Sequence, residues 1–357
     1  MSAKTQKQSG GGQKRVLYFD VLRAIAPIFV VFIHAVVTFR PQNTTNHVIQ
    51  EFGRWAVPIF FMISGALLIN PKKKFDTKTF YLKNIKRLVV CLFAWSAIYA
   101  LLYTFCNPDR TTSMAYSLSF GIAGGYSYHM WFMYALIAAY IMMPLMRYIC
   151  ADKKMLRYVL FVGLIICLGL PLVGLSGRIL AKWTGNQLLM GYAEGGFLVE
   201  KVSSRLSSFT MLFYLPLGYY LSTEQFEKKM RWFIYALGIA GFIVELMWIQ
   251  VGEQLFGVAE ATTISFLPVF CVSSAIFLAT RNLFQNRKKI PRILSFMAKH
   301  SFGVYLGHLV VLSFIMKRSG VFGGSIWMVL LATIATYGLS LIISWLLSKI
   351  PFLRRIV

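Results

Sequence analysis

The chain has 357 residues, of which 57% are hydrophobic and only 14% are charged, and its mean hydropathy is +0.64. A soluble domain carries about 25% charged residues, so this composition excludes a soluble enzyme and a secreted disulfide scaffold. The net charge of +25 does not indicate a nucleic-acid partner, because the Lys and Arg residues lie in short loops between apolar blocks, as the positive-inside rule describes. The sequence predicts an all-α, polytopic membrane protein.

Apolar blocks of about 20 residues, the length of a membrane-spanning helix, divide the chain. Residues 1–15 are polar and Gly-rich and predict a disordered cytoplasmic tail. Residues 16–350 predict a single transmembrane domain of ten helices, and residues 351–357 a second cytoplasmic tail. The ten predicted spans are 16–39, 53–70, 88–106, 129–147, 158–175, 208–222, 232–250, 263–283, 301–317 and 325–348.

The distribution of charge predicts the orientation of these spans. The segments that ten spans place on the side of the termini hold 27 Lys and Arg residues, against nine in the opposite segments. Because cytoplasmic loops carry the excess of Lys and Arg, we expect both termini in the cytoplasm. The long connections at about 107–128 and 176–207 then face outward.

The first span carries ionisable residues, which are costly inside a membrane and indicate function. Asp20, Arg23, Pro27 and His34 are spaced 3, 4 and 7 apart and therefore share one stripe of a helix. Arg23 and His34 are separated by roughly 16 Å along the helix axis at 1.5 Å per residue. The alternative is structural: Asp20 and Arg23 pair with each other, and His34 bonds a neighbouring carbonyl.

Further candidate residues lie at the edges of other spans. Ser64 and Gly65 interrupt an apolar run, a pattern that also serves close helix packing. The basic run that follows contains Lys83, Lys86 and Arg87, which topology or a bound polyanion would explain equally. His129 and Trp131 begin the fourth span, and Tyr305 and His308 lie in the ninth. The His and Cys residues lack the spacing of a metal site, so we predict no metal.

Four of these patterns occur in order along the chain: Arg23 followed by ten residues and His34, the Pro58–Leu68 stretch, His129 to Phe132, and Ser301 to His308. Together they resemble the acyltransferase 3 family of bacterial integral-membrane O-acyltransferases. One departure is the first cytoplasmic loop, where the family often has Arg-x-x-Arg and this chain has Lys83-Asn84-Ile85-Lys86-Arg87.

The resemblance implies transfer of an acetyl or other acyl group from cytoplasmic acyl-CoA to a hydroxyl of an envelope glycan or lipid-linked sugar. It implies a bacterial inner-membrane location, acetyl-CoA as cosubstrate and no prosthetic group. His34 and His129 are the implied catalytic residues. The implied donor-binding residues are Arg23, Lys83, Lys86 and Arg87, and the residues that shape or support the channel are Asp20, Ser64, Trp131, Tyr305 and His308.

Two roles for His34 remain open at this point, because an imidazole with a pKa near neutral suits a general base and a transient acyl carrier alike. Two other functions also fit a basic inner face and charges inside the spans. One is a transporter or flippase of a lipid-linked sugar, and the other is a lipid-sugar glycosyltransferase. Turnover of acetyl-CoA distinguishes the acyltransferase from both.

Overall fold

A computed structural model describes residues 16–40, 44–106, 128–166, 176, 179–186, 198–256, 266–319 and 325–357. Within these ranges the regular elements are helices, as the sequence predicts. The tail predicted for residues 1–15, nearly all of the predicted outer connection at 107–128, and residues 177–178 and 187–197 of the second predicted outer connection lie outside the described residues.

The helices follow the predicted apolar blocks in order. They are α1 (Leu17–Phe39), α2 (Thr44–Arg54), α3 (Ala56–Leu68), α4 (Thr77–Phe80), η1 (Tyr81–Ile85), α5 (Lys86–Cys106), η2 (Tyr128–Met130), α7 (Trp131–Ile141), α8 (Met143–Ile149), α9 (Lys153–Leu164), α12 (Leu198–Thr223), α13 (Lys228–Phe256), α15 (Phe266–Phe284), α16 (Arg292–Ser319), α17 (Ile326–Lys349) and η4 (Leu353–Arg355).

Six helices in the described part of the chain are long and apolar enough to cross a membrane. A seventh span results if α7 and α8, which meet at a bend of 53°, are counted together, and Pro268–Phe284 is a shorter apolar helix. The predicted second and third spans begin earlier than expected, at Thr45 and Thr77. The protein is therefore a multi-pass membrane protein, while the number ten and the orientation of the termini stay predictions.

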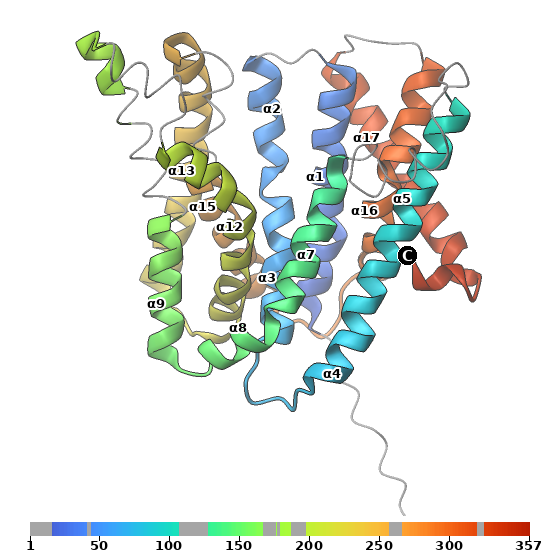
Figure 1. Ribbon diagram of the computed structural model, residues 1–357, viewed down its shortest axis with the longest axis horizontal. Helices are drawn as coiled ribbons and strands as arrows, with labels where there is room; N and C mark the ends of the chain where they lie inside the picture. The colour runs from blue at the N-terminus through green and yellow to red at the C-terminus, as the bar shows by residue number, and fades with distance from the viewer. Residues whose placement is uncertain are drawn as a thin grey trace, which may run out of the picture.

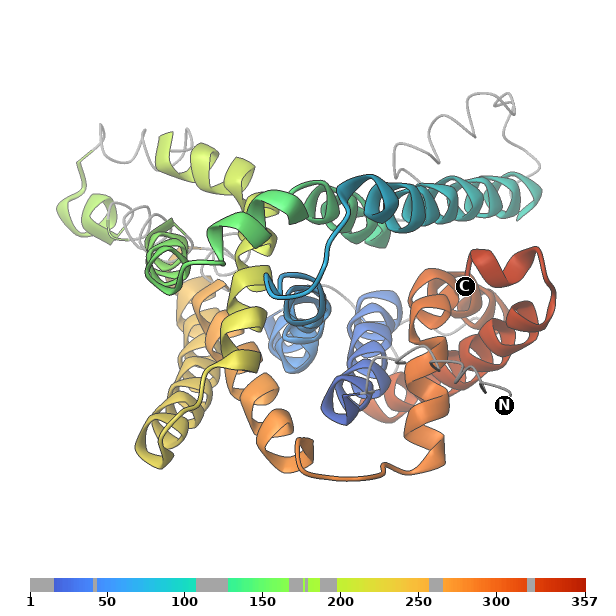
Figure 2. The same ribbon diagram turned by 90° about the horizontal axis from the view of Figure 1, so that it is seen from below.

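Helix α1 lies in the middle of the bundle, between the α2–α3 pair on one side and α16 and α17 on the other (Figure 1; Figure 2, seen from below). Helix α12 packs along α3, and α13 packs along α15. Because helices surround α1, its polar stripe is held inside protein, where an intramembrane charge can find partners.

Two glycines bring α3 and α12 into very close contact. A Cβ on Gly65 would lie 1.9 Å from the carbonyl oxygen of Leu215, and a Cβ on Gly218 would lie 2.1 Å from the carbonyl oxygen of Met62. Only glycine fits at either position, so main chain packs on main chain as in other small-residue membrane interfaces. The packing role that the sequence suggests for Gly65 is therefore observed.

Two arginines that the sequence counts only as topological charges bind the ends of helices. Arg147 donates to the carbonyl oxygens of Leu68 and Lys73, each at 2.6 Å, and so satisfies the end of α3. Arg281 donates to the carbonyl oxygens of Leu221 at 2.6 Å and Glu224 at 2.7 Å, at the end of α12. The last carbonyl groups of a helix have no partner within it, so these cations stabilise both ends.

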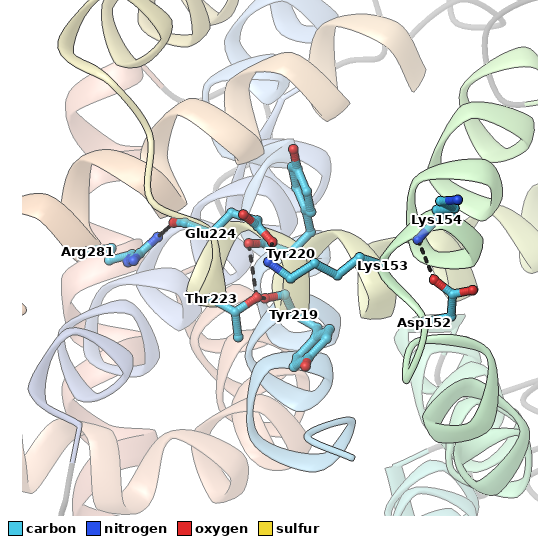
Figure 3. A network of polar contacts seen from close by, with 8 residues as sticks. All are labelled: Asp152, Lys153, Lys154, Tyr219, Tyr220, Thr223, Glu224 and Arg281. Atoms are coloured by element: carbon cyan, nitrogen blue, oxygen red, sulfur yellow. Dashed lines mark hydrogen bonds and ion pairs between the residues drawn. The ribbon is translucent and has the colours of Figure 1, made fainter. Parts of the chain in front are cut away.

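Figure 3 shows the second of these arrangements. Arg281 reaches the main chain at Glu224, whose carboxylate forms an ion pair with Lys153 of α9 at 2.8 Å. Asp152 caps the start of α9 by accepting a hydrogen bond from the N–H of Lys154 at 2.7 Å. These contacts join α9, α12 and α15 at one end of the bundle.

Candidate active site

The polar stripe of α1 opens into a cavity of about 710 Å³, here called the central cavity. Asp20 and Arg23 line it, and the nearest atoms of their side chains are 4.0 Å apart. The side chain of Arg23 is 36% exposed whereas that of Asp20 is 8% exposed, so the guanidinium is the more accessible of the two charges and the carboxylate lies beside it. Helix α1 is continuous through Pro27, which preserves the axial spacing of Arg23 and His34.

Other helices bring two further cations to the central cavity. Arg87 comes from the start of α5, and Lys299 comes from α16. Ser64 of α3 also lines the cavity and shares a hydrogen bond with Tyr140 of α7. The complete lining is Asp20, Arg23, Phe60, Ile63, Ser64, Asn84, Arg87, Leu88, Phe132, Leu136, Tyr140, Ser295, Phe296, Ala298, Lys299, Ser301, Phe302 and Tyr305.

The segment before α5 contains a turn of π-helix. Asp76 begins α4 by accepting a hydrogen bond from the N–H of Thr79 at 2.7 Å. Hydrogen bonds from Thr79 hold the pKa of Asp76 below its usual value. The π-helix η1 follows directly and carries Lys83 and Asn84. Such wide turns are frequent at functional sites, and here Asn84 lines the central cavity.

Three histidines from three different helical segments meet above this cavity. The ring centroids of His34 and His308 are 5.0 Å apart, those of His129 and His308 are 5.0 Å apart, and those of His34 and His129 are 6.2 Å apart. His129 is 1% exposed and His308 is fully buried. The structure therefore brings the two predicted catalytic histidines together and adds His308 as a direct neighbour of both.

Hydrogen bonds to the surrounding main chain and tyrosines orient this histidine cluster. Nδ1 of His308 lies 2.6 Å from the carbonyl oxygen of Tyr305. Because a carbonyl only accepts, Nδ1 carries the proton, and Nε2 of a neutral His308 then holds a lone pair. That Nε2 has no hydrogen-bond partner among the described residues. It is a buried base beside His34 and His129.

Three tyrosines complete the shell around the cluster. The hydroxyl of Tyr128 lies 2.7 Å from Nδ1 of His34, and the hydroxyl of Tyr99 lies 3.5 Å from Nε2 of His129. Tyr305 donates its hydroxyl proton to the carbonyl oxygen of His129. These contacts fix ring positions, which a site needs if groups are to act at close range.

Tyr305 connects the histidine cluster with the central cavity. It lines the cavity, and its ring centroid lies 5.6 Å from that of His129 and 5.9 Å from that of His308. Phe132, which also lines the cavity, packs against Tyr305 at 4.8 Å between ring centroids. The cavity thus extends from cations toward an aromatic end that borders the imidazoles of His129 and His308.

Not every predicted site residue reaches the central cavity or the cluster. Trp131, predicted to support the channel, is 44% exposed on α7, and its neighbour Tyr128 makes the contact to His34 instead. Lys83 and Lys86 line an adjoining cavity rather than the central one. Tyr99, Tyr128 and Lys299 are not marked as site residues by the sequence, since aromatic belts and topological charges have the same residue types; Asn84 carries no signal of its own there.

The closeness of the histidines does not make them a metal centre. Among the described residues, no group of three or more His, Cys, Asp or Glu side chains has an arrangement that could hold a metal ion. The three imidazoles can act as acids and bases near neutral pH.

Residues 16–349 match the model of a protein family described as an acyltransferase domain. The chain belongs to the acyltransferase 3 family. The match covers nearly the whole chain, including every residue of the histidine cluster and the central cavity. No curated protein and no solved structure matches the chain.

Family membership makes this protein a membrane acyltransferase that acts on groups other than aminoacyl groups. The residues around the central cavity and the histidine cluster are accordingly the candidates for acyl transfer.

Proposed function

We propose that the protein transfers an acyl group, acetyl in the simplest case, from cytoplasmic acyl-CoA to a hydroxyl of a cell-envelope glycan or glycolipid. The observation that carries this proposal is that Tyr305 both lines the central cavity and contacts the histidine cluster. Arg23, Arg87 and Lys299 line the cavity and suit a phosphorylated donor, and Tyr305 links it to buried imidazoles.

The proposed acceptor class and location follow the resemblance of the chain to other family members. Ten predicted spans in a single transmembrane domain resemble the O-acetyltransferase of enterobacterial common antigen. An envelope glycan, modified at the bacterial inner membrane, is therefore the acceptor that we propose.

In the first form of the mechanism His34 is a general base. It removes the proton from the acceptor hydroxyl, whose oxygen attacks the thioester carbonyl, and the carbon–sulfur bond breaks. The imidazolium then returns its proton to the departing thiolate, so that free CoA leaves. A positioned base of this kind contributes about 10²–10⁴-fold to the rate.

In the second form His34 is a carrier of the acyl group. A ring nitrogen of His34 attacks the thioester and expels the CoA thiolate, which takes the proton that the acylated imidazole gives up, so that CoA leaves as the thiol. The acceptor hydroxyl then attacks the acyl group, the carbon–nitrogen bond to His34 breaks, and the hydroxyl proton returns to the imidazole. His308 suits either form, because its Nε2 lone pair lies in a ring 5.0 Å from that of His34 and can relay these protons. His129 borders both rings and would orient the acceptor.

The test uses purified protein in nanodiscs with radiolabelled acetyl-CoA, with and without extracted membrane glycolipids as acceptor. CoA release and label on the protein are measured for the parent, His34→Ala and His47→Ala, the last a histidine of α2 outside the cluster. We expect turnover in the parent and in His47→Ala, and a loss of at least about 100-fold in His34→Ala. Label that accumulates on the parent without acceptor supports the carrier form.

Two outcomes contradict the proposal. If the folded parent consumes neither acetyl-CoA nor another acyl-CoA, the proposed donor is wrong. If His34→Ala retains the rate of the parent, His34 takes no part in the chemistry.

A further inference from the structure

A second cavity, with a volume of about 860 Å³, adjoins the central cavity. This second cavity is here called the basic basin. Three separate parts of the chain supply its cations, which are Lys83, Lys86 and Arg87 from η1 and α5, Lys299 from α16, and Arg354 and Arg355 from η4. Its described lining residues include no acidic side chain. This concentration of positive charge suits an anionic ligand.

The last residues of the chain are clamped against α5 by hydrogen bonds to their main chain, which fixes the position of the segment that carries Arg354 and Arg355. The indole N–H of Trp95 donates to the carbonyl oxygen of Ile356 at 2.9 Å, and Arg87 donates to the main-chain oxygen of Val357 at 3.0 Å. Cys91 lies between Trp95 and Arg87 on the same stripe of α5 and contacts the carbonyl oxygen of Arg355 at 3.5 Å.

Packing against α16 completes this clamp. Ile356 is only 8% exposed, and Gly303 of α16 leaves room for Val357, because a Cβ there would lie 3.2 Å from the Cβ of that residue. Figures 1 and 2 show the chain end beside α5 and α16. Residues 351–357, predicted as a cytoplasmic tail, thus form a wall of the basic basin, and Arg354 and Arg355 differ from loop cations that serve topology alone.

The basic basin and the central cavity share Arg87 and Lys299 among their lining residues. A ligand that spans both would place its highly charged end among the six cations of the basin, two of which also line the central cavity, and a less charged part deeper in the central cavity. Each cavity falls within the range of about 300–1,000 Å³ that is usual for small-molecule sites. This division matches a donor whose reactive thioester is joined to a phosphorylated nucleotide by a flexible arm.

We propose that the basic basin binds the phosphorylated nucleotide end of the acyl donor, with Lys299, Arg354 and Arg355 as phosphate ligands beside Lys83, Lys86 and Arg87. This inference rests on the proposed function, since it assumes a nucleotide-linked donor. Arg354 and Arg355 present planar guanidinium forks, which bind phosphate through paired hydrogen bonds. The clamped chain end is then part of the donor site.

The experiment compares two donors that carry the same thioester. Acetyl-CoA has the nucleotide and its phosphates, whereas acetyl-pantetheine has the same arm without them. The test variant is Arg354→Gln/Arg355→Gln. The matched control is Lys288→Gln/Lys289→Gln, which removes two exposed charges of the loop before α16, outside both cavities.

We expect the test variant to raise the KM for acetyl-CoA by about tenfold or more, because charge-assisted hydrogen bonds to phosphate are lost. The kcat and KM for acetyl-pantetheine should stay those of the parent, and the control should match the parent with both donors. An equal change with both donors, or a change with neither, overturns the inference while leaving acyl transfer in place.

Anionic lipid headgroups share the phosphate chemistry, so the measurement is repeated in nanodiscs of phosphatidylcholine alone and with added phosphatidylglycerol. If a lipid is the occupant, added phosphatidylglycerol changes the kinetics of the parent equally with both donors, and the inference fails. If the parent turns over neither donor, the proposed function fails separately. Calorimetry with adenosine 3′,5′-bisphosphate then decides the inference: binding to the parent that the test variant loses supports it, and no binding overturns it.

Discussion

Replacing Gly65 by alanine tests the contact on which the position of α3 depends. The added Cβ would lie 1.9 Å from the carbonyl oxygen of Leu215, whereas ordinary contacts begin near 3.4 Å. The two helices must therefore separate by about 1.5 Å, and inserting one carbon into a tightly packed contact of this kind typically costs about 1–3 kcal/mol. Relief by rotation of a side chain is not available, because the atom in the way belongs to the main chain.

Gly338→Ala is the matched control, since the same Cβ in the middle of α17 meets nothing within 4 Å. Alanine there should leave the unfolding free energy unchanged or raise it by up to about 1 kcal/mol, because glycine disfavours a helix interior. The assay is unfolding in mixed detergent and SDS micelles, followed by circular dichroism.

A functional effect should accompany the loss of stability in Gly65→Ala. Phe60, Ile63 and Ser64 lie on the same helix and line the central cavity, so a shift of α3 should also raise the KM for the donor. If Gly65→Ala and Gly338→Ala unfold alike and bind donor alike, the close approach of α3 and α12 is refuted.

Three further predictions concern single side chains. Tyr128→Phe loses the hydroxyl 2.7 Å from His34 and should lower kcat. Trp131→Phe, on the exposed side of α7, should leave kcat unchanged. Equal kcat values for the two variants would show that the Tyr128 hydroxyl has no part in the reaction. His308→Asn keeps a donor for the carbonyl of Tyr305 but loses the Nε2 lone pair. Its kcat should therefore fall by about 10²-fold, while its melting temperature stays that of the parent. A kcat equal to that of the parent would exclude His308 from proton transfer. Arg281→Gln should lower the unfolding free energy by about 2 kcal/mol, because charged hydrogen bonds to the end of α12 are lost. Glu224→Gln breaks the ion pair to the 74% exposed Lys153 and should lower the unfolding free energy by less than about 1 kcal/mol. If chemical unfolding shows a larger loss for Glu224→Gln than for Arg281→Gln, Arg281 does not stabilise the end of α12.

Much of the bundle follows from local sequence patterns. Apolar blocks of membrane length predict where helices lie, and each predicted span overlaps a helix in the described part of the chain. The spacing of Arg23 and His34 likewise predicts their shared stripe on α1. Hydrophobic length and helical periodicity are properties of neighbouring residues, so a single sequence contains them.

The composition of the site depended on contacts that no local pattern contains. His34, His129 and His308 lie far apart in the sequence, and only the packing of α1, η2 and α16 brings their rings within 5.0–6.2 Å of one another. The sequence marks each histidine as unusual in a membrane, but it does not say which of them meet.

The roles of the Lys and Arg residues likewise cannot be read from the sequence alone. A Lys or Arg near the end of a span looks alike in sequence whether it serves topology, caps a helix or lines a cavity. The structure separates these roles: Arg147 and Arg281 bind helix ends, while Lys299 and Arg354 line the basic basin.

The sequence by itself thus determined the membrane class, the helical segments and the family pattern, because each apolar block and each motif rests on residues within a few helical turns of one another. Only the tertiary structure decided the histidine cluster, the two joined cavities and the clamped chain end. Those features depend on side-chain fit between helices, and that fit is a property of surfaces that meet only after the chain has folded.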